Sequence, residues 1–230
     1  MNLFCLSLLI LLIKNLFAYP YYNLCTHIDE SKKILNTTNG LVSGECYSVR
    51  LSYFSGLKSN VDVYSWLSIP YAVPPTGANR FKKSLPAEKY DTIRDGKKWP
   101  KACIQHAQDE YNGVSWENIK LENMSEDCLY LNVFSRSDSY LNSDKREMLS
   151  PILFYIHGRT FVLGNSASDL LEPSTLVAMT GLIVVTFNYR LDALGLLHLS
   201  GTEASGNQAF HDQTMALKWV KEFFCYFFNE

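Results

Sequence analysis

Two short apolar runs in the second half of the chain constrain its fold more than any other feature. Residues 151–156 (PILFYI) and 182–188 (LIVVTFN) each have the length and the β-branched and aromatic content of a buried strand. The segment between them, 166–180, changes from polar to apolar and predicts a helix. A strand, a helix and a second strand in this order favour a parallel strand pair. The sequence therefore predicts an α/β architecture with a partly parallel sheet.

The remaining elements follow from local patterns. Residues 47–54 (YSVRLSYF) and 61–69 (VDVYSWLSI) have the composition of antiparallel strands, and 129–134 (LYLNVF) predicts a further strand. The proline-punctuated stretch 70–81 predicts a loop. A last helix is expected to begin near Asp212, which would be an acidic residue of its first turn. Six apolar residues share one face of that helix at helical spacing: Ala216, Trp219, Val220, Phe223, Phe224 and Phe227.

The N-terminus predicts a secretory signal peptide. Residues 3–13 (LFCLSLLILLI) form an apolar run that is too short for a membrane span of about 20 residues, and Lys14 interrupts its continuation. The run fits the apolar core of a signal peptide over residues 1–18, with cleavage after Ala18. An uncleaved signal anchor and a buried core helix are the alternatives. Residues 19–46 follow as a polar N-terminal arm that we expect at the surface.

Composition restricts the partners and the cellular compartment. The 230 residues carry 21 basic and 23 acidic side chains, for a net charge of −2, which indicates neither nucleic acid nor an anionic membrane as a partner. Removal of Cys5 with the signal leaves an odd number of the six cysteines. In a secreted chain these are disulfide candidates. Two glycosylation sequons, at Asn36 and Asn123, agree with the secretory route.

Six blocks along the chain identify a family. They are IPYAVPPTGANRF (69–81), ACIQ (102–105), SEDCLYLNVFSR (125–136), YIHG (155–158), NYRLDALGLL (188–197) and GNQAFHDQTMALKWV (206–220). In this order they resemble the N-terminal part of a type-B carboxylesterase/cholinesterase, an α/β-hydrolase. The resemblance covers roughly residues 47–222, so we assign 47–230 as the N-terminal part of such a domain. It implies a partial α/β-hydrolase fold that ends before the nucleophile elbow. The implied central sheet is mixed and mostly parallel, with N-terminal antiparallel strands.

The resemblance also implies structural pairs. It implies a disulfide between Cys103 and Cys128, which would stabilise the fold by about 3 kcal/mol in the chain-entropy model. It implies two internal ion pairs as fold determinants, Arg80 with Glu126 and Arg190 with Asp212. The pairing of Cys25, Cys46 and Cys225 is left open.

The catalytic residues of such a hydrolase are missing from the 230 residues. Ester hydrolysis on this fold needs a serine in a G-x-S-x-G turn, a histidine, an acid and backbone N–H donors for the oxyanion. None of the 12 glycines begins a G-x-S-x-G sequence. None of the five histidines matches the family's catalytic position, and no histidine pair has metal-ligand spacing: His27, His106, His157, His198 and His211. We expect no catalytic residue, no metal site and no cofactor.

The oxyanion loop also departs from the family. Active relatives have consecutive glycines after the histidine at position 157, and these glycines provide the oxyanion N–H groups. Here Gly158 is kept, while Arg159 and Thr160 occupy the next two positions. A β-branched threonine is a poor substitute where the backbone must adopt unusual angles. Two other glycine positions of the family hold Ser68 and Asp192.

Three functions are compatible with this sequence. The first is a truncated, secreted carboxylesterase/cholinesterase-like protein that is inactive as this chain. The second is a non-catalytic, cholinesterase-like binding or adhesion module with an extracellular protein partner. The third is a short secreted decoy or scaffold. An ester would be a substrate only of a longer product. We expect secretion without a stable membrane span, with a signal-anchored membrane protein as the alternative.

Overall fold

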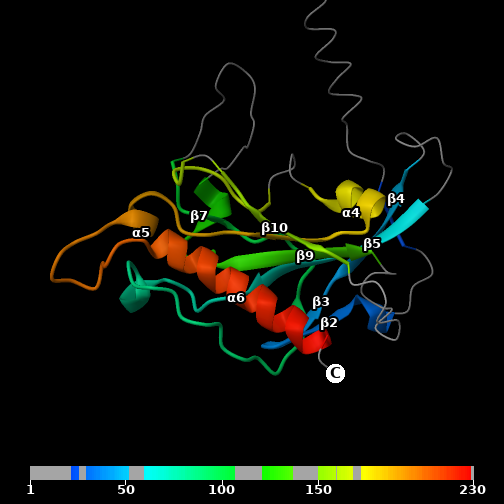
Figure 1. The fold of residues 1–230 in the computed structure, drawn as a ribbon, viewed down its shortest axis with the longest axis horizontal. Helices are drawn as coiled ribbons and strands as arrows, with labels where there is room; N and C mark the ends of the chain where they lie inside the picture. The colour runs from blue at the N-terminus through cyan, green and yellow to red at the C-terminus, as the bar shows by residue number, and fades with distance from the viewer. Residues whose placement is uncertain are drawn as a thin grey trace, which may run out of the picture.

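A six-stranded sheet forms the centre of the protein in a computed structural model, which describes residues 22–25, 30–51, 60–106, 121–136, 150–158, 160–167 and 172–228 (Figure 1). Its strands lie in the order β1-β4-β5-β9-β11-β10. They are β1 (Tyr22–Leu24), β4 (Glu45–Arg50), β5 (Asn60–Pro70), β9 (Tyr130–Arg136), β11 (Ile183–Phe187) and β10 (Ile152–Ile156).

The sheet is mixed, but the prediction of a mostly parallel sheet is wrong for the described residues. Only β10 and β11 pair in parallel, and the other four neighbouring pairs are antiparallel. The reason lies in the connections. The connection from β10 to β11 contains helix α4 (Ser174–Thr180). A parallel pair requires such a long connection, because the chain must cross over the sheet before the second strand begins. The described residues between the earlier strands of the sheet contain no α-helix.

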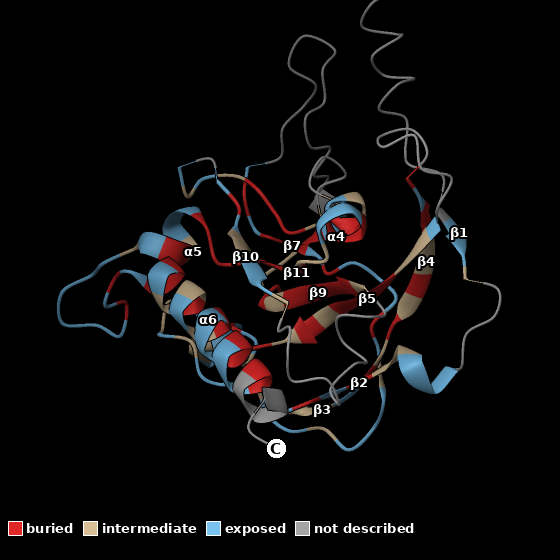
Figure 2. Cartoon of the chain, turned by 45° about the vertical axis from the view of Figure 1, so that its right-hand side comes forward, coloured by how far each residue is buried: buried red, intermediate tan, exposed pale blue. Residues whose placement is uncertain are grey.

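The two faces of the sheet support separate hydrophobic clusters. Consecutive residues of one strand belong to different clusters, as Val133 and Phe134 do, because successive side chains point to opposite faces. Val177 and Ala178 of α4 pack on the face that contains Phe134. The long helix α6 (Gln208–Phe228) packs on the other face, and Figure 2 shows its buried side turned toward the sheet. The chain therefore has three layers, as in other α/β folds.

The helices differ from their predicted bounds. Within the predicted helix 166–180, residues 166–167 and 172–173 are not helical and α4 covers 174–180, since Pro173 disfavours the helical conformation for the residue before it. Helix α6 begins at Gln208 rather than near Asp212, and a short helix, α5 (Asp192–Leu196), precedes it. Asp212 is therefore not a first-turn residue. Five residues of the predicted apolar face are buried, and the side chain of the sixth, Phe227, is not described: Ala216, Trp219, Val220, Phe223 and Phe224.

The expectation of a surface arm over 19–46 is wrong for much of its described part. Strands β2 (Ile34–Thr37) and β3 (Gly40–Ser43) form a hairpin, and Leu35 and Val42 are fully buried. Strand β6 (Arg94–Asp95) joins this hairpin in parallel, and β7 (Ala102–Cys103) pairs with β8 (Met124–Ser125). The described residues also include three short 3₁₀ helices: η1 (Glu30–Lys33), η2 (Gly77–Asn79) and η3 (Leu121–Asn123).

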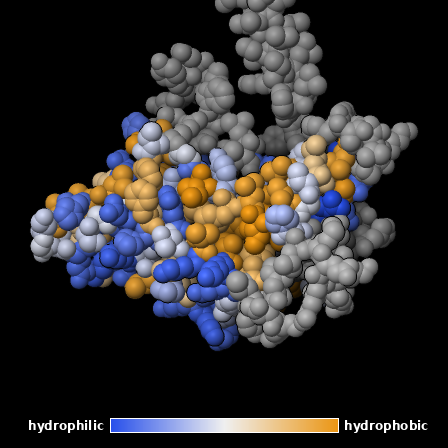
Figure 3. Space-filling view, viewed as in Figure 1, coloured by the Kyte–Doolittle hydropathy of each residue, from blue (hydrophilic) through white to orange (hydrophobic). Residues whose placement is uncertain are grey.

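Strand β10 is the outermost described strand on one side of the sheet, so the prediction of a buried strand at 151–156 is wrong within the described chain. Ile152, Leu153 and Ile156 are 36%, 39% and 46% exposed. Figure 3 shows hydrophobic surface gathered in the middle of this view, over the region where Figure 1 draws the sheet between α4 and α6. Exposed apolar edge strands favour pairing with further polypeptide.

No helix in the described ranges combines the length and the apolar character that a membrane crossing requires. The predicted signal peptide, residues 1–18, lies outside the described residues.

Candidate functional site: the loop after β10

The loop that follows β10 keeps a left-handed backbone although it lacks the expected glycines. Thr160 and Phe161 have φ angles of 56° and 63°. Gly158 does not lie in the left-handed region, and a Cβ there would meet nothing within 4 Å. The steric demand for glycine therefore falls on position 160. A left-handed conformation costs an L-residue roughly 1–2 kcal/mol. Arg159 lies outside the described residues.

His157 anchors the start of this loop in the core. Its side chain is only 4% exposed and stacks on Tyr189, with ring centroids 4.3 Å apart. Burial lowers the pKa of His157 to about 4, against an opposing effect of the Gly158 backbone, so the ring is neutral at pH 7. Neither ring nitrogen makes a hydrogen bond of normal geometry within the described part of the chain. The side chain therefore packs in the core as a neutral ring.

Tyr189 also fixes the backbone of the loop. Its hydroxyl donates a 2.7 Å hydrogen bond to the carbonyl oxygen of His157. Burial raises the pKa of Tyr189 to about 12, so the hydroxyl retains its proton for this bond. Further along, the carbonyl oxygen of Phe161 accepts a hydrogen bond from the Asp192 N–H at 2.7 Å, and the Phe161 ring packs on Tyr189 and Phe210. The left-handed turn is thus held on several sides.

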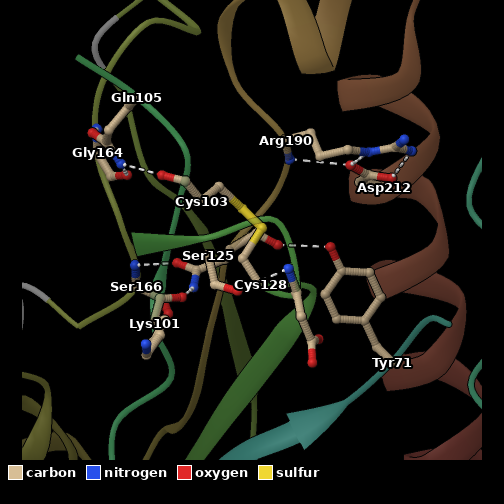
Figure 4. The surroundings of a disulfide bond; sticks show 12 residues. Tyr71, Lys101, Cys103, Gln105, Ser125, Cys128, Gly164, Ser166, Arg190 and Asp212 are labelled. Carbon is tan, nitrogen blue, oxygen red and sulfur yellow. Dashed lines mark hydrogen bonds and ion pairs between the residues drawn. A yellow bond between two sulfur atoms is a disulfide. The ribbon is translucent and has the colours of Figure 1, made fainter. Parts of the chain in front are cut away.

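Gln105 holds the far end of the loop beside the disulfide. Its side-chain oxygen accepts from the Gly164 N–H at 2.8 Å, and its Nε2 donates to the Gly164 carbonyl at 2.9 Å and to the Cys103 carbonyl at 3.0 Å. Cys103 is disulfide-bonded to Cys128, which joins β7 to the segment before β9 (Figure 4). Gly164 has φ +120°, and a Cβ there would lie 2.6 Å from His157 Nδ1. Only glycine fits that position.

Ser68 and Asp192 show why a glycine suits their positions. Their φ angles are 55° and 50°, in the left-handed region. Ser68 lies in the β-bulge of β5, where its N–H donates to Asn132 Oδ1 at 3.1 Å and its hydroxyl donates to the Lys98 carbonyl at 2.7 Å. Bulges commonly place a residue in this conformation, for which glycine is the usual choice. Three departures from the family pattern, at 68, 160 and 192, therefore coincide with left-handed backbone.

The pair of Arg190 with Asp212 ties the end of β11 to α6. The guanidinium Nε and Nη2 donate to the two carboxylate oxygens at 2.8 and 2.7 Å, and the side chains are 3% and 0% exposed. The Arg190 N–H also donates to this carboxylate, and Nη1 donates to the Lys82 carbonyl. This geometry is bidentate and fully desolvated (Figure 4). The role of Asp212 is this buried pair and not the helix dipole.

The pair of Arg80 with Glu126 has the same fork geometry at the surface. Arg80 Nε and Nη2 lie 2.6 and 2.8 Å from the two Glu126 oxygens. The side chains are 44% and 28% exposed, so water screens the charges. The pair links the loop after η2 to the segment between β8 and β9, two residues before Cys128.

One serine–histidine contact exists in the described chain that the sequence did not suggest. Ser200 Oγ lies 3.4 Å from His198 Nε2 on an exposed turn. The distance is long, and no carboxylate orients the imidazole among the described residues. A nucleophile of the Ser–His type needs both a short bond to the base and a third group. This contact has neither feature.

Comparison with known proteins agrees with the geometry. A model of the carboxylesterase family matches residues 31–227. The chain belongs to the carboxylesterase family. In this member of the family, Gln105 and Tyr189 hold the loop after β10 beside the Cys103–Cys128 disulfide.

The similar proteins are named as cholinesterases and carboxylesterases. Acetylcholinesterase-1 of Trittame loki is 36% identical over 194 residues, which are 83% of this chain and 34% of that protein. Para-nitrobenzyl esterase of Bacillus subtilis is 40% identical over 162 residues, 70% of this chain and 31% of that protein. Human cocaine esterase is 32% identical over 202 residues, 86% of this chain and 34% of that protein. The chain spans about a third of the length of these carboxylesterase relatives.

Sequence reasoning missed the polar side chains that form hydrogen bonds next to the loop after β10. Asn188 Oδ1 accepts from the Ser166 N–H at 2.8 Å, and Asn132 Nδ2 donates to Ser166 Oγ at 3.1 Å and to Thr186 Oγ1 at 3.0 Å. The blocks that contain Gln105 and Asn188 were visible in the sequence, but their partners lie 59 and 22 residues away. The sequons, Asn36 and Asn123, are exposed.

Proposed function

We propose that this chain provides the N-terminal third of a secreted carboxylic ester hydrolase fold, including its oxyanion loop, and hydrolyses no ester by itself. The observation that supports the proposal most directly is the loop after β10, which keeps its left-handed turn and its anchors although glycine is absent at 160. A backbone held in this way by Gln105, Tyr189 and Gly164 is a scaffold for oxyanion donors. The nucleophile that would use these donors has no G-x-S-x-G counterpart in the 230 residues.

Two further observations support parts of the proposal. The open, apolar edge of β10 is suited to pairing with another strand, as a larger α/β sheet requires. Two disulfides, Cys25–Cys46 and Cys103–Cys128, favour an oxidising compartment and hence secretion. Mass spectrometry of the exported protein should find Tyr19 as its first residue, and an N-terminus at Met1 would contradict cleavage after Ala18.

Hydrolysis of a p-nitrophenyl ester tests the absence of activity. The purified chain should release p-nitrophenol no faster than the same protein after denaturation. A rate that saturates with substrate and disappears on denaturation would refute the proposal. A matched variant, His157→Phe, removes the buried imidazole, so any residual rate that it abolishes would have come from this loop.

A chimera tests whether the loop can serve an ester hydrolase. Residues 31–222 would replace the matching part of the Bacillus para-nitrobenzyl esterase, which then provides the nucleophile. The chimera should be slow, and the double variant Arg159→Gly/Thr160→Gly should raise kcat by about 10²-fold, the typical value of one oxyanion donor. A folded chimera in which the glycines change nothing would contradict the assigned role of this loop and favour the binding-module alternative.

A further inference from the structure

A second disulfide, remote from the oxyanion loop, lies beside a carboxylate. The Cys25–Cys46 disulfide joins the end of β1 to β4, at the edge of the sheet opposite to β10. Residue 46 pairs with Tyr64 on β5, and Asp62 is two positions away on the same strand. Since side chains two positions apart share a face, Asp62 lies on the face of β5 that contains the disulfide.

The three side chains form a compact group of potential ligands. The two Sγ atoms and a carboxylate oxygen of Asp62 all lie within 4.8 Å of one another. Asp62 is half-buried, and its carboxylate has no hydrogen bond or ion pair with another described residue. No other group of three histidine, cysteine or acidic residues in the described part of the chain is as close. The disulfide Cys103–Cys128 therefore has no such neighbour and provides an internal comparison.

We propose that reduction of the Cys25–Cys46 disulfide creates a Zn²⁺ site made of these two sulfurs and Asp62. A phosphine reductant takes the disulfide and one water to two thiols and a phosphine oxide. Zn²⁺ then binds both thiolates and the carboxylate, and the two thiol protons are released to solvent. Water completes the four ligands, as in zinc sites with three protein ligands.

The geometry of the strands suits this metal. Zinc–sulfur bonds of about 2.3 Å and zinc–oxygen bonds of about 2.0–2.2 Å place the atoms of a tetrahedral ligand set roughly 3.5–3.8 Å apart. The three atoms lie within 4.8 Å of one another, so small side-chain rotations are expected to bring them to that range. The sulfurs need to separate. The six-residue pairing of β4 with β5 holds Cys46 and Asp62 in place, and the β1–β4 pairing with the 3.1 Å bond from the Cys25 N–H to the Cys46 carbonyl holds Cys25. Thiolate ligands favour zinc over Mg²⁺ and Ca²⁺, which prefer oxygen.

Zinc titration of the full chain tests this site. The protein carries Cys5→Ser and Cys225→Ser, so that thiols outside the two disulfides do not contribute. After reduction by a phosphine and its removal without oxygen, Zn²⁺ is titrated against a chromophoric chelator. Cobalt absorption reports thiolate ligation independently. We expect one equivalent of tight zinc in the reduced chain and none in the oxidised chain.

Matched variants assign the ligands. Cys25→Ser should abolish tight binding, and the isosteric Asp62→Asn should raise the Kd for zinc about tenfold or more, since even indirect partners of a ligand cost that much. The double variant Cys103→Ser/Cys128→Ser should bind zinc as the parent does. Asp62→Asn keeps both sulfurs and folds in the oxidised form, so it tests the carboxylate even if Cys25→Ser is unstable. Binding that survives Cys25→Ser, unchanged affinity in Asp62→Asn, or no binding by the reduced parent would each overturn the proposal.

Discussion

Replacing Thr160 by glycine should stabilise the protein. The left-handed backbone at Thr160, with φ 56°, costs this L-residue roughly 1–2 kcal/mol. The side chain is exposed, so little packing is lost. Glycine also makes the unfolded chain more flexible, which offsets about 0.4–1 kcal/mol. The net expectation is a gain of about 0.5–1 kcal/mol in the free energy of unfolding, or a Tm higher by roughly 1–4 °C for a chain of this size.

Equilibrium unfolding in urea at pH 7 measures this difference, with Leu153→Lys present in the parent and in every variant so that the exposed β10 edge does not cause aggregation. The midpoint should rise with an unchanged slope, since the surface exposed on unfolding stays the same. Gly164→Ala is the opposing control. It places a Cβ 2.6 Å from His157 Nδ1 at φ +120°, so it should destabilise by about 2 kcal/mol or more. Ser68→Gly is the intermediate control, because relief of strain is offset by loss of the hydroxyl bond to the Lys98 carbonyl.

The three variants together test whether the left-handed backbone angles explain the family's glycines in this loop. If Thr160→Gly lowered the stability, or if Gly164→Ala left it unchanged, the backbone angles of this loop could not be the reason that the family has glycines here. A gain in Thr160→Gly equal to the gain in Ser68→Gly would also contradict it, since only Ser68 loses a hydrogen bond.

Three further predictions concern the buried pair, the buried histidine and the open edge. Asp212→Asn should lower the free energy of unfolding in urea by about 3–5 kcal/mol, because the Arg190 charge stays buried and uncompensated. Arg80→Ala, at the exposed pair, should lower it far less. Equal losses in the two variants would contradict the role of burial. His157 has its pKa lowered from 6.5 to about 4, so the unfolded chain binds the proton more strongly. Stability should therefore be full above pH 6.5 and fall by about 3 kcal/mol as pH decreases to 4. His157→Phe should remove that part of the pH dependence, and an unchanged slope would refute it. The isolated chain should aggregate through β10, and Leu153→Lys should increase the soluble monomer in size-exclusion chromatography; a sharp, cooperative melt of soluble wild-type monomer would contradict this expectation.

The sequence by itself determined most strands of the central sheet and the family. Continuous apolar runs and strand-forming residues are local signals, so 61–69, 129–134 and 182–188 appear as β5, β9 and β11 with shifts of one or two residues. The motif blocks identified the family, which the comparison confirmed. The structure contains the disulfide and the two ion pairs that the resemblance implied. The strands and the family could be predicted because they depend on residue type and order, whereas the three pairs were predicted only through the family resemblance.

The tertiary structure decided what depends on neighbours distant in the sequence. Leu35 is buried only because other segments cover its hairpin, and β10 is an open edge only because nothing in the described chain pairs beyond it. Likewise, an odd set of cysteines cannot specify Cys25–Cys46, which needs β1 and β4 side by side. The left-handed angle at Thr160 is a property of the folded loop, which its anchors impose at a cost in free energy. Residue types fix what each segment prefers, and packing across the sheet determines which preferences are satisfied.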